Sequence, residues 1–207
     1  MMVIFLWVIV LILYLIRHAK TSWNDRGLWQ GNVDIPLNDE GYLQAKKLAQ
    51  RFSGLSIEAI YTSPLSRSYQ TAEEISKVLL QQPIVESSLR ECEISLWNGL
   101  TMSETLEKYE NQYKYWSMNP LATVEGVESL QNVQNRTVSV IQQISSSHRG
   151  NVIVVSHAIA IKMIICWVLG LPIPFSKNFR IENASVSALD FSDNPRLILL
   201  NDTCHLL

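Results

Sequence analysis

The sequence predicts a three-layer α/β/α sandwich built around a mostly parallel central sheet. The run LILYLI at residues 11–16 carries no charge and little polarity, and NVIVVS at residues 151–156 is nearly as apolar. Such runs are typical of strands that are buried on both faces. Segments with helical spacing of apolar residues follow them. An alternation of strands and helices places helices on both faces of a parallel sheet.

The first half of the chain begins with the strand at residues 11–16. Asn38 then has the side chain of a helix N-cap, and the helix after it has one apolar face, made by Ala45, Leu48, Ala49 and Phe52. A short strand follows at residues 59–62. Ser63 and Pro64 predict the next helix, with serine as its cap and proline at its first position, and this helix runs to about Leu80.

The second half continues the alternation. Residues 102–116 predict a polar helix rich in aromatic residues, and a helix with regular apolar spacing begins near Ser129. The strand at 151–156 and an apolar helix at 158–169 come next. Two final strands are predicted at residues 186–191 and 197–200, with the turn between them at Asp193, Asn194 and Pro195.

The composition limits the class of protein. A chain of 207 residues with 47% hydrophobic and 17% charged residues is sufficient for one folded domain with a substantial core. The net charge is −2 and no basic block is present, so we expect no nucleic-acid partner. Cys92, Cys166 and Cys204 are far apart and odd in number. This predicts neither a disulfide framework nor a zinc site and fits a reducing cytoplasm, with Cys166 in the core.

Residues 1–10 are predicted to be an apolar N-terminal extension ahead of a single domain at residues 11–207. Residues 1–16 carry no charge, but a membrane helix needs about 20 apolar residues. The start also lacks the basic residues and the cleavage site of a secretory signal. We therefore expect an extension of the first strand or a poorly ordered start and no membrane partner, with a membrane-associating segment as the alternative. The sequence makes no prediction of the oligomeric state.

Two histidines follow directly after predicted buried strands. Arg17 and His18 come directly after the first strand, and His157 comes directly after the strand at 151–156. In open α/β sheets, ligands bind beyond the carboxyl ends of the strands. Neutral imidazole is available at pH 7 to attack phosphorus, and guanidinium groups neutralise phosphoryl oxygens. A surface Arg–His pair is the alternative for the dipeptide alone, but two histidines at matching strand ends favour a common site.

Two further segments supply the other groups that phosphoryl transfer needs. Arg67 lies in the first turn of its helix, where backbone N–H groups already favour an anion, although a solvated helix arginine is the alternative. Glu91 is the candidate general acid for the leaving oxygen, and Glu93 competes with it. Spacing alone does not separate these two carboxylates.

Taken in order, these segments resemble the histidine phosphatase (phosphoglycerate-mutase-like) superfamily, from about Leu11 to Leu206. Members open with R-H-G-x-T-x-x-N, which here reads RHAKTSWN at residues 17–24. The family's Q-G and D-x-P-L-(T/N)-x-x-G-x-x-Q-A stretches match residues 30–31 and 34–45. Its S-P-L-x-R-x-x-x-T-A, L-x-E-x-x-x-G-x-W-E-G and V-S-H-G motifs match residues 63–72, 89–99 and 155–158.

The resemblance implies a phosphoglycerate-mutase-like fold and a role for each matching residue. His18 would become a phosphohistidine intermediate, and Glu91 would donate and then accept the proton. Arg17, Arg67 and His157 would line the phosphate pocket. The remaining phosphoryl contacts would come from Asn24, Gln30 and Gly31. The resemblance implies a small phosphorylated substrate, no cofactor and no metal.

The sequence departs from the family pattern at several positions. Ala19 and Ala158 replace glycines, and either would add strain of about 1 kcal/mol if the position required positive φ. Ser95 and Asn98 replace the glycine and the second glutamate of the acid motif. Lys20 adds a positive charge beside the site, either as a substrate contact or as a solvated side chain.

The segment at residues 100–128 separates the functional alternatives. Family mutases usually carry a longer insertion over the site, and only about thirty residues lie between Gly99 and the helix near Ser129. We therefore predict a phosphomonoester hydrolase, with a phosphoglycerate mutase as the alternative and a non-catalytic phosphate-binding domain as a third possibility. Four aromatic residues in this segment form either a lid or ordinary packing: Tyr109, Tyr113, Tyr115 and Trp116.

Overall fold

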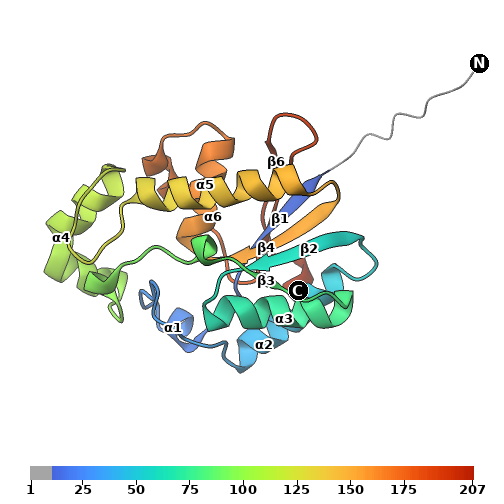
Figure 1. Ribbon diagram of the computed structural model, residues 1–207. Helices are drawn as coiled ribbons and strands as arrows, with labels where there is room; N and C mark the ends of the chain where they lie inside the picture. Colours follow the sequence, from blue (N-terminus) through green and yellow to red (C-terminus); the bar gives the residue numbers. More distant parts are fainter. Residues whose placement is uncertain (1–10) are drawn as a thin grey trace, which may run out of the picture.

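The computed structural model describes residues 11–207, and its strands alternate with helices along the chain (Figure 1). The strands are β1 (Ile12–Arg17), β2 (Ile57–Thr62), β3 (Ile84–Val85), β4 (Asn151–Ser156), β5 (Val186–Asp190) and β6 (Arg196–Asp202). The α-helices are α1 (Ser22–Asp25), α2 (Asp39–Arg51), α3 (Ser66–Leu79), α4 (Met102–Met118), α5 (Leu130–Ser147) and α6 (Ala158–Val168). Four short 3-10 helices complete the described chain: η1 (Ser87–Leu89), η2 (Ser95–Trp97), η3 (Ile173–Asn178) and η4 (Cys204–Leu206).

The six strands form one sheet in the order β3-β2-β4-β1-β5-β6. Strands β3, β2, β4 and β1 pair in parallel, and β5 is antiparallel to both of its neighbours. Arg17 in β1 is in register with Ser156 in β4, and the His18 N–H donates to the Ser156 carbonyl at 2.9 Å. This register brings the residues that follow both strands, His18 and His157, to one edge of the sheet.

Helices cover both faces of the sheet, which confirms the predicted α/β/α sandwich. Helices α2 and α3 lie on one side, and α5 and α6 lie on the other (Figure 1). One core cluster joins Leu13 and Leu15 of β1 to α5 and α6, and a second joins Ile16 to α2 and α3. Alternate side chains of a strand point to opposite faces, so one buried strand supplies both cores.

Most predicted elements are present within one or two residues of their predicted bounds, but the predicted N-cap of α3 is wrong. The helix begins at Ser66 with Leu65 as its N-cap, two residues after the predicted cap Ser63 and the predicted first position Pro64. The Ser63 hydroxyl lies 2.8 Å from a ring nitrogen of His157, so it is not a cap for this helix. Asp34 on another segment accepts from the Ser66 N–H at 2.7 Å and from its hydroxyl at 2.7 Å.

Several other features bear on the predictions. The short elements α1 and β3 were not predicted, because each has too few residues for a periodic pattern. Cys166 is fully buried, as predicted. The predicted extension at residues 1–10 lies outside the described residues. Within residues 11–207, no helix is long and apolar enough to cross a membrane.

Candidate active site

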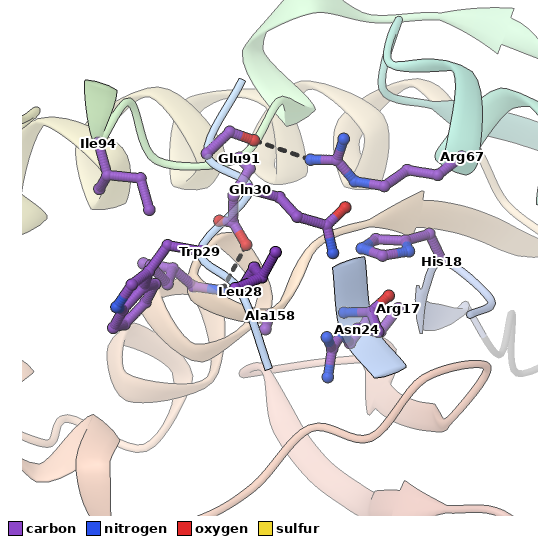
Figure 2. A pocket seen from close by; sticks show the side chains of 12 residues that line it. Arg17, His18, Asn24, Leu28, Trp29, Gln30, Arg67, Glu91, Ile94 and Ala158 are labelled. Atoms are coloured by element: carbon purple, nitrogen blue, oxygen red, sulfur yellow. Dashed lines mark hydrogen bonds between the residues drawn. The ribbon is translucent and has the colours of Figure 1, made fainter. Parts of the chain in front are cut away.

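A pocket of about 110 Å³ opens where β1 and β4 end, and it gathers seven of the eight predicted site residues. They come from segments that are far apart in the sequence and surround one space (Figure 2). These lining residues are Arg17, His18, Asn24, Gln30, Gly31, Arg67 and Glu91. The eighth, His157, lies behind His18, and the centroids of the two imidazole rings are 5.2 Å apart.

His18 is held in the tautomer that a nucleophile requires. Its Nδ1 lies 2.7 Å from the Ala19 carbonyl oxygen, which can only accept, so Nδ1 carries the proton. The lone pair is therefore on Nε2. Burial lowers the pKa of His18 well below its usual value, and the nearby charges of Arg67 and Arg17 lower it further. The ring thus remains neutral and nucleophilic at neutral pH.

His157 is oriented by a chain of hydrogen bonds. The Leu65 N–H donates to the Ser63 hydroxyl oxygen at 3.3 Å, and this hydroxyl lies 2.8 Å from His157 Nε2. Burial, followed by the charge of Arg67, lowers the pKa of His157 well below its usual value, so the ring is neutral. A hydroxyl that donates to Nε2 leaves the ring proton on Nδ1. Within residues 11–207 this buried Nδ1 has no hydrogen-bond partner, which leaves a donor for an anion.

Backbone carbonyls fix the two arginines. Arg67 donates to the carbonyls of Val33 and Gly31 at 2.8 Å each, and Arg17 donates to the Ile181 carbonyl at 2.7 Å. Burial lowers the pKa of Arg67 to about 10, so it is still a cation at neutral pH. The guanidinium groups therefore approach the pocket in fixed orientations, as bidentate anion binding requires.

Glu91 lies over the N-terminus of α6. Its carboxylate accepts from the N–H groups of Cys92, Ile159 and Ala160 at 2.9, 3.2 and 3.3 Å. The helix dipole favours a negative group at this position. Glu93 does not line the pocket, because its carboxylate accepts from Asn32 at 3.0 Å. The carboxylate that faces the pocket is that of Glu91.

Arg136 supports the main chain that carries Glu91. It donates to the carbonyls of Ser88, Arg90 and Glu91 at 2.7, 2.7 and 2.9 Å. Its Nε lies 2.9 Å from a carboxylate oxygen of Glu128 in a mostly buried ion pair. The loop with Glu91 is thereby attached to α5 at several points, despite the substitutions at Ser95 and Asn98.

Asn24, Gln30 and Gly31 complete the polar wall. Asn24 Oδ1 accepts from the Thr21 N–H at 3.0 Å and from Asn183 Nδ2 at 3.2 Å, so its amide nitrogen is free to donate to a ligand. Gln30 is mostly buried at the pocket surface. Gly31 has φ of +49°, and a Cβ there would lie 2.7 Å from Cγ1 of Ile94, so only glycine fits.

The departures from the family pattern do not disturb this geometry. The non-glycine residues with positive φ in the described chain are Leu80, Ala184 and Asn201, so Ala19 and Ala158 carry none of the strain that positive φ would cause. Lys20 forms ion pairs with Asp25 at 2.9 Å and Glu40 at 2.8 Å. These ion pairs favour the interpretation of Lys20 as a solvated surface side chain over that of a substrate contact.

The aromatic segment of α4 is divided between two environments. Trp116 is buried and packs edge to face against Trp97, with ring centroids 5.2 Å apart. Tyr113 packs against Trp29, with ring centroids 6.2 Å apart. Tyr115 is exposed. Part of this segment is therefore ordinary packing, and the part beside Trp29 borders the site.

Sequence reasoning missed three residues that orient the site: Ser63, Arg136 and Asn183. Asn183 donates to the His18 carbonyl at 3.1 Å as well as to Asn24. Ser63 belongs to the family motif at residues 63–72, where a serine before proline also fits a helix cap. No signal in a single sequence identifies the other two, because each acts on a segment more than forty residues away.

Comparison with known proteins agrees with the site geometry. A model of the histidine phosphatase superfamily (branch 1) matches residues 13–203, and the chain belongs to this family. It is 36% identical to phosphoserine phosphatase 1 of Hydrogenobacter thermophilus over 94% of this chain and 93% of the relative. It is 32% identical to the "Probable phosphoglycerate mutase GpmB" of Cronobacter sakazakii over 89% of this chain and 86% of that one. A phosphoserine phosphatase from Entamoeba histolytica, solved with phosphoserine, aligns with a TM-score of 0.87 and 26% identity over 95% of this chain and all of that one.

Membership of this family defines the class of reaction. The chain is a metal-independent phosphomonoester hydrolase that acts on a small phosphorylated metabolite through a phosphohistidine intermediate. In the part of the chain that the structure describes, no group of three His, Cys, Asp or Glu side chains could hold a metal ion.

Proposed function

We propose that His18 is the nucleophile of this hydrolase and Glu91 its acid and base. His18 Nε2 attacks phosphorus, the ester P–O bond breaks, and the Glu91 carboxyl gives its proton to the leaving oxygen. The Glu91 carboxylate then takes a proton from water, whose oxygen attacks phosphorus. The N–P bond breaks, and inorganic phosphate and neutral His18 result.

The other pocket residues would neutralise and orient the transferring group. Arg17 and Arg67 would carry the charge of the phosphoryl oxygens, with the Nδ1–H of His157 as a further donor. Asn24, Gln30 and the backbone around Gly31 would complete the contacts. The observation that carries the proposal is the 2.7 Å bond from His18 Nδ1 to the Ala19 carbonyl, because it leaves Nε2 free inside a pocket with two guanidinium groups.

The nucleophile can be tested with p-nitrophenyl phosphate in the presence of EDTA. We expect turnover by the wild type and a loss of at least about a thousandfold for His18→Asn, because covalent catalysis requires the lone pair. His148→Asn is the matched control, since His148 pairs with Glu58 outside the pocket. Binding of phosphate without any turnover would instead indicate a phosphate-binding domain.

The acid can be tested through the leaving group. p-Nitrophenolate departs without a proton, whereas an alkoxide does not. Glu91→Gln should therefore lower kcat/KM for an alkyl phosphate by about a hundredfold or more, and phosphorylation by p-nitrophenyl phosphate far less. Glu93→Gln is the control. Equal losses for both substrates would assign the acid role elsewhere.

The relatives suggest the first substrates to test. Phosphoserine is the substrate named for the bacterial relative and bound in the Entamoeba structure, and 3-phosphoglyceric acid is bound in a second structure of that protein. The relative with a mutase name supports phosphoglycerate mutation as a second candidate function. Incubation with 3-phosphoglycerate separates the two, because a phosphatase releases inorganic phosphate and a mutase forms 2-phosphoglycerate.

We further propose that residues 11–207 form a single domain in which residues 100–128 act as a lid. The supporting observation is that Tyr113 and Trp116 of α4 border a cavity next to the pocket. We also propose a cytoplasmic location, supported by three free cysteines, of which Cys92 and Cys166 are buried.

A further inference from the structure

The pocket has an apolar side, where the leaving group of a substrate must lie. Its polar residues lie together around the proposed phosphoryl position, and Leu28, Trp29, Ile94 and Ile159 line the rest (Figure 2). Glu91 is the only carboxylate in this lining, and it is the proposed acid. The apolar side therefore offers no free carboxylate to a cation further out on the leaving group, which makes the desolvation of such a cation costly.

A second cavity of about 110 Å³ lies beside this apolar side. It shares Trp29 and Ile159 with the pocket, and Tyr113 and Trp116 of α4 add two aromatic walls. We call it the outer cavity. Aromatic walls of this kind bind planar or apolar groups by stacking and burial.

Two lysines give the outer cavity its charge. Lys162 of α6 and Lys177 of η3 line it, and no carboxylate does. Neither lysine forms an ion pair with any of residues 11–207. Lys162 is half-buried, with its ammonium 5.6 Å from the centre of the Phe179 ring, and Lys177 is exposed and approaches the Met118 sulfur at 3.5 Å.

Charged groups of both signs lie near Lys162. Burial lowers its pKa, the nearby charge of Arg17 adds to this effect, and Arg180 contributes in the same direction. Glu91 opposes them. An anion in the outer cavity would thus meet two lysines and no carboxylate in its lining, whereas these lysines would repel a cation.

We propose that the outer cavity selects phosphomonoesters whose leaving group has a planar or apolar body next to the ester oxygen and an anionic group further out, bound by Lys162 and Lys177. This inference rests on the proposed function, because it requires the phosphoryl group to lie at His18. It specifies the substrate class of the same site: an organic phosphate with a carboxylate, or with a second phosphate, in its leaving group.

Two aryl phosphates of nearly equal shape test the proposal. 4-(2-Carboxyethyl)phenyl phosphate ends in a carboxylate and 4-(2-aminoethyl)phenyl phosphate ends in an ammonium ion, while their phenolic leaving groups are similar. We expect kcat/KM to favour the carboxylate by about tenfold or more, because partly buried charge pairs give discrimination of this order. 4-(2-Phosphonoethyl)phenyl phosphate shows whether a second phosphorus oxyanion binds better than a carboxylate.

Lysine variants assign the selectivity to the outer cavity. Lys162→Met and Lys177→Met keep much of the apolar stem and remove the charge. Each should reduce the carboxylate-to-ammonium ratio, and the double variant should bring it close to one. Lys108→Met makes the same change on an exposed residue of α4 and should keep the wild-type ratio. Phenyl phosphate, which has no distal charge, measures the phosphoryl chemistry in every variant.

The outcomes separate this inference from the proposed function. A wild-type ratio near one, or a double variant with the wild-type ratio, overturns the inference while hydrolysis of phenyl phosphate continues. Loss of the proposed function would appear instead as no hydrolysis of phenyl phosphate, or as hydrolysis that survives His18→Asn. If Lys162→Met does not fold, the exposed Lys177→Met and the wild-type ratio still decide the question.

Discussion

Ser63→Ala tests how the pocket orients its second histidine. The Ser63 hydroxyl accepts from the Leu65 N–H and lies 2.8 Å from His157 Nε2, and we expect it to donate its proton toward the ring. Without the hydroxyl, Nε2 loses its partner in a fully buried place. The ring proton can then move to Nε2, which removes the donor that we propose Nδ1 presents to the phosphoryl group.

The expected loss follows from the value of one buried hydrogen bond. A net contribution of about 1–1.5 kcal/mol corresponds to a decrease of about tenfold in kcat/KM for p-nitrophenyl phosphate. Ser63→Cys, whose thiol is a weak donor of similar size, should give an intermediate loss. A melting curve for each variant shows whether the fold survives the change.

The tautomer itself can be observed by ¹⁵N NMR of histidine-labelled protein, with His157→Asn to assign the signals. We expect the protonated nitrogen of His157 to be Nδ1 in the wild type and a mixture of tautomers in Ser63→Ala. An alanine variant with kcat/KM within twofold of the wild type and an unchanged Nδ1–H signal would refute this reasoning.

Three further perturbations follow from the site. Burial and the charges of Arg67 and Arg17 keep the pKa of His18 well below 6.5, so its neutral form is lost only in more acidic solution. Because Arg67→Gln removes one of these charges, it should raise this pKa and shift the acid limb of the kcat/KM profile to higher pH. An acid limb at the same pH in both proteins would contradict this cause. Gly31→Ala should lower the free energy of unfolding, measured in urea, by about 1–3 kcal/mol, because residue 31 has positive φ and the new Cβ would lie 2.7 Å from Ile94 Cγ1. Wild-type stability of this variant would contradict the steric argument. Arg136→Met should lower the free energy of unfolding by about 3 kcal/mol in the same assay, since it leaves the mostly buried Glu128 carboxylate without its arginine. A loss below about 1 kcal/mol would show that this ion pair adds little to stability.

The fold could be predicted in large part because its signals are local. The apolar runs of β1 and β4 lie in the centre of the sheet, where both faces are buried. Predicting them also placed His18 and His157 at the ends of two strands. The finding that these strands are neighbours, with Arg17 opposite Ser156, depends on long-range packing that a single sequence does not contain.

The supporting residues of the site could not be predicted, for a related reason. Arg136 lies on a helix whose other face is apolar, and a polar residue at such a place is usually solvated. Its three carbonyl partners lie on the loop near Glu91, which comes more than forty residues earlier. Ser63 was visible, but its hydroxyl had two compatible roles, and only the position of His157 decides between them.

The most direct test of the account is to trap the phosphoenzyme in Glu91→Gln with p-nitrophenyl phosphate. This substrate phosphorylates the protein without an acid, and the variant lacks the base that would activate water. We predict about one base-stable, acid-labile phosphate per chain, which mass spectrometry and ³¹P NMR assign to Nε2 of His18. Phosphate on His157, on Nδ1 of His18, or on no histidine would contradict the account.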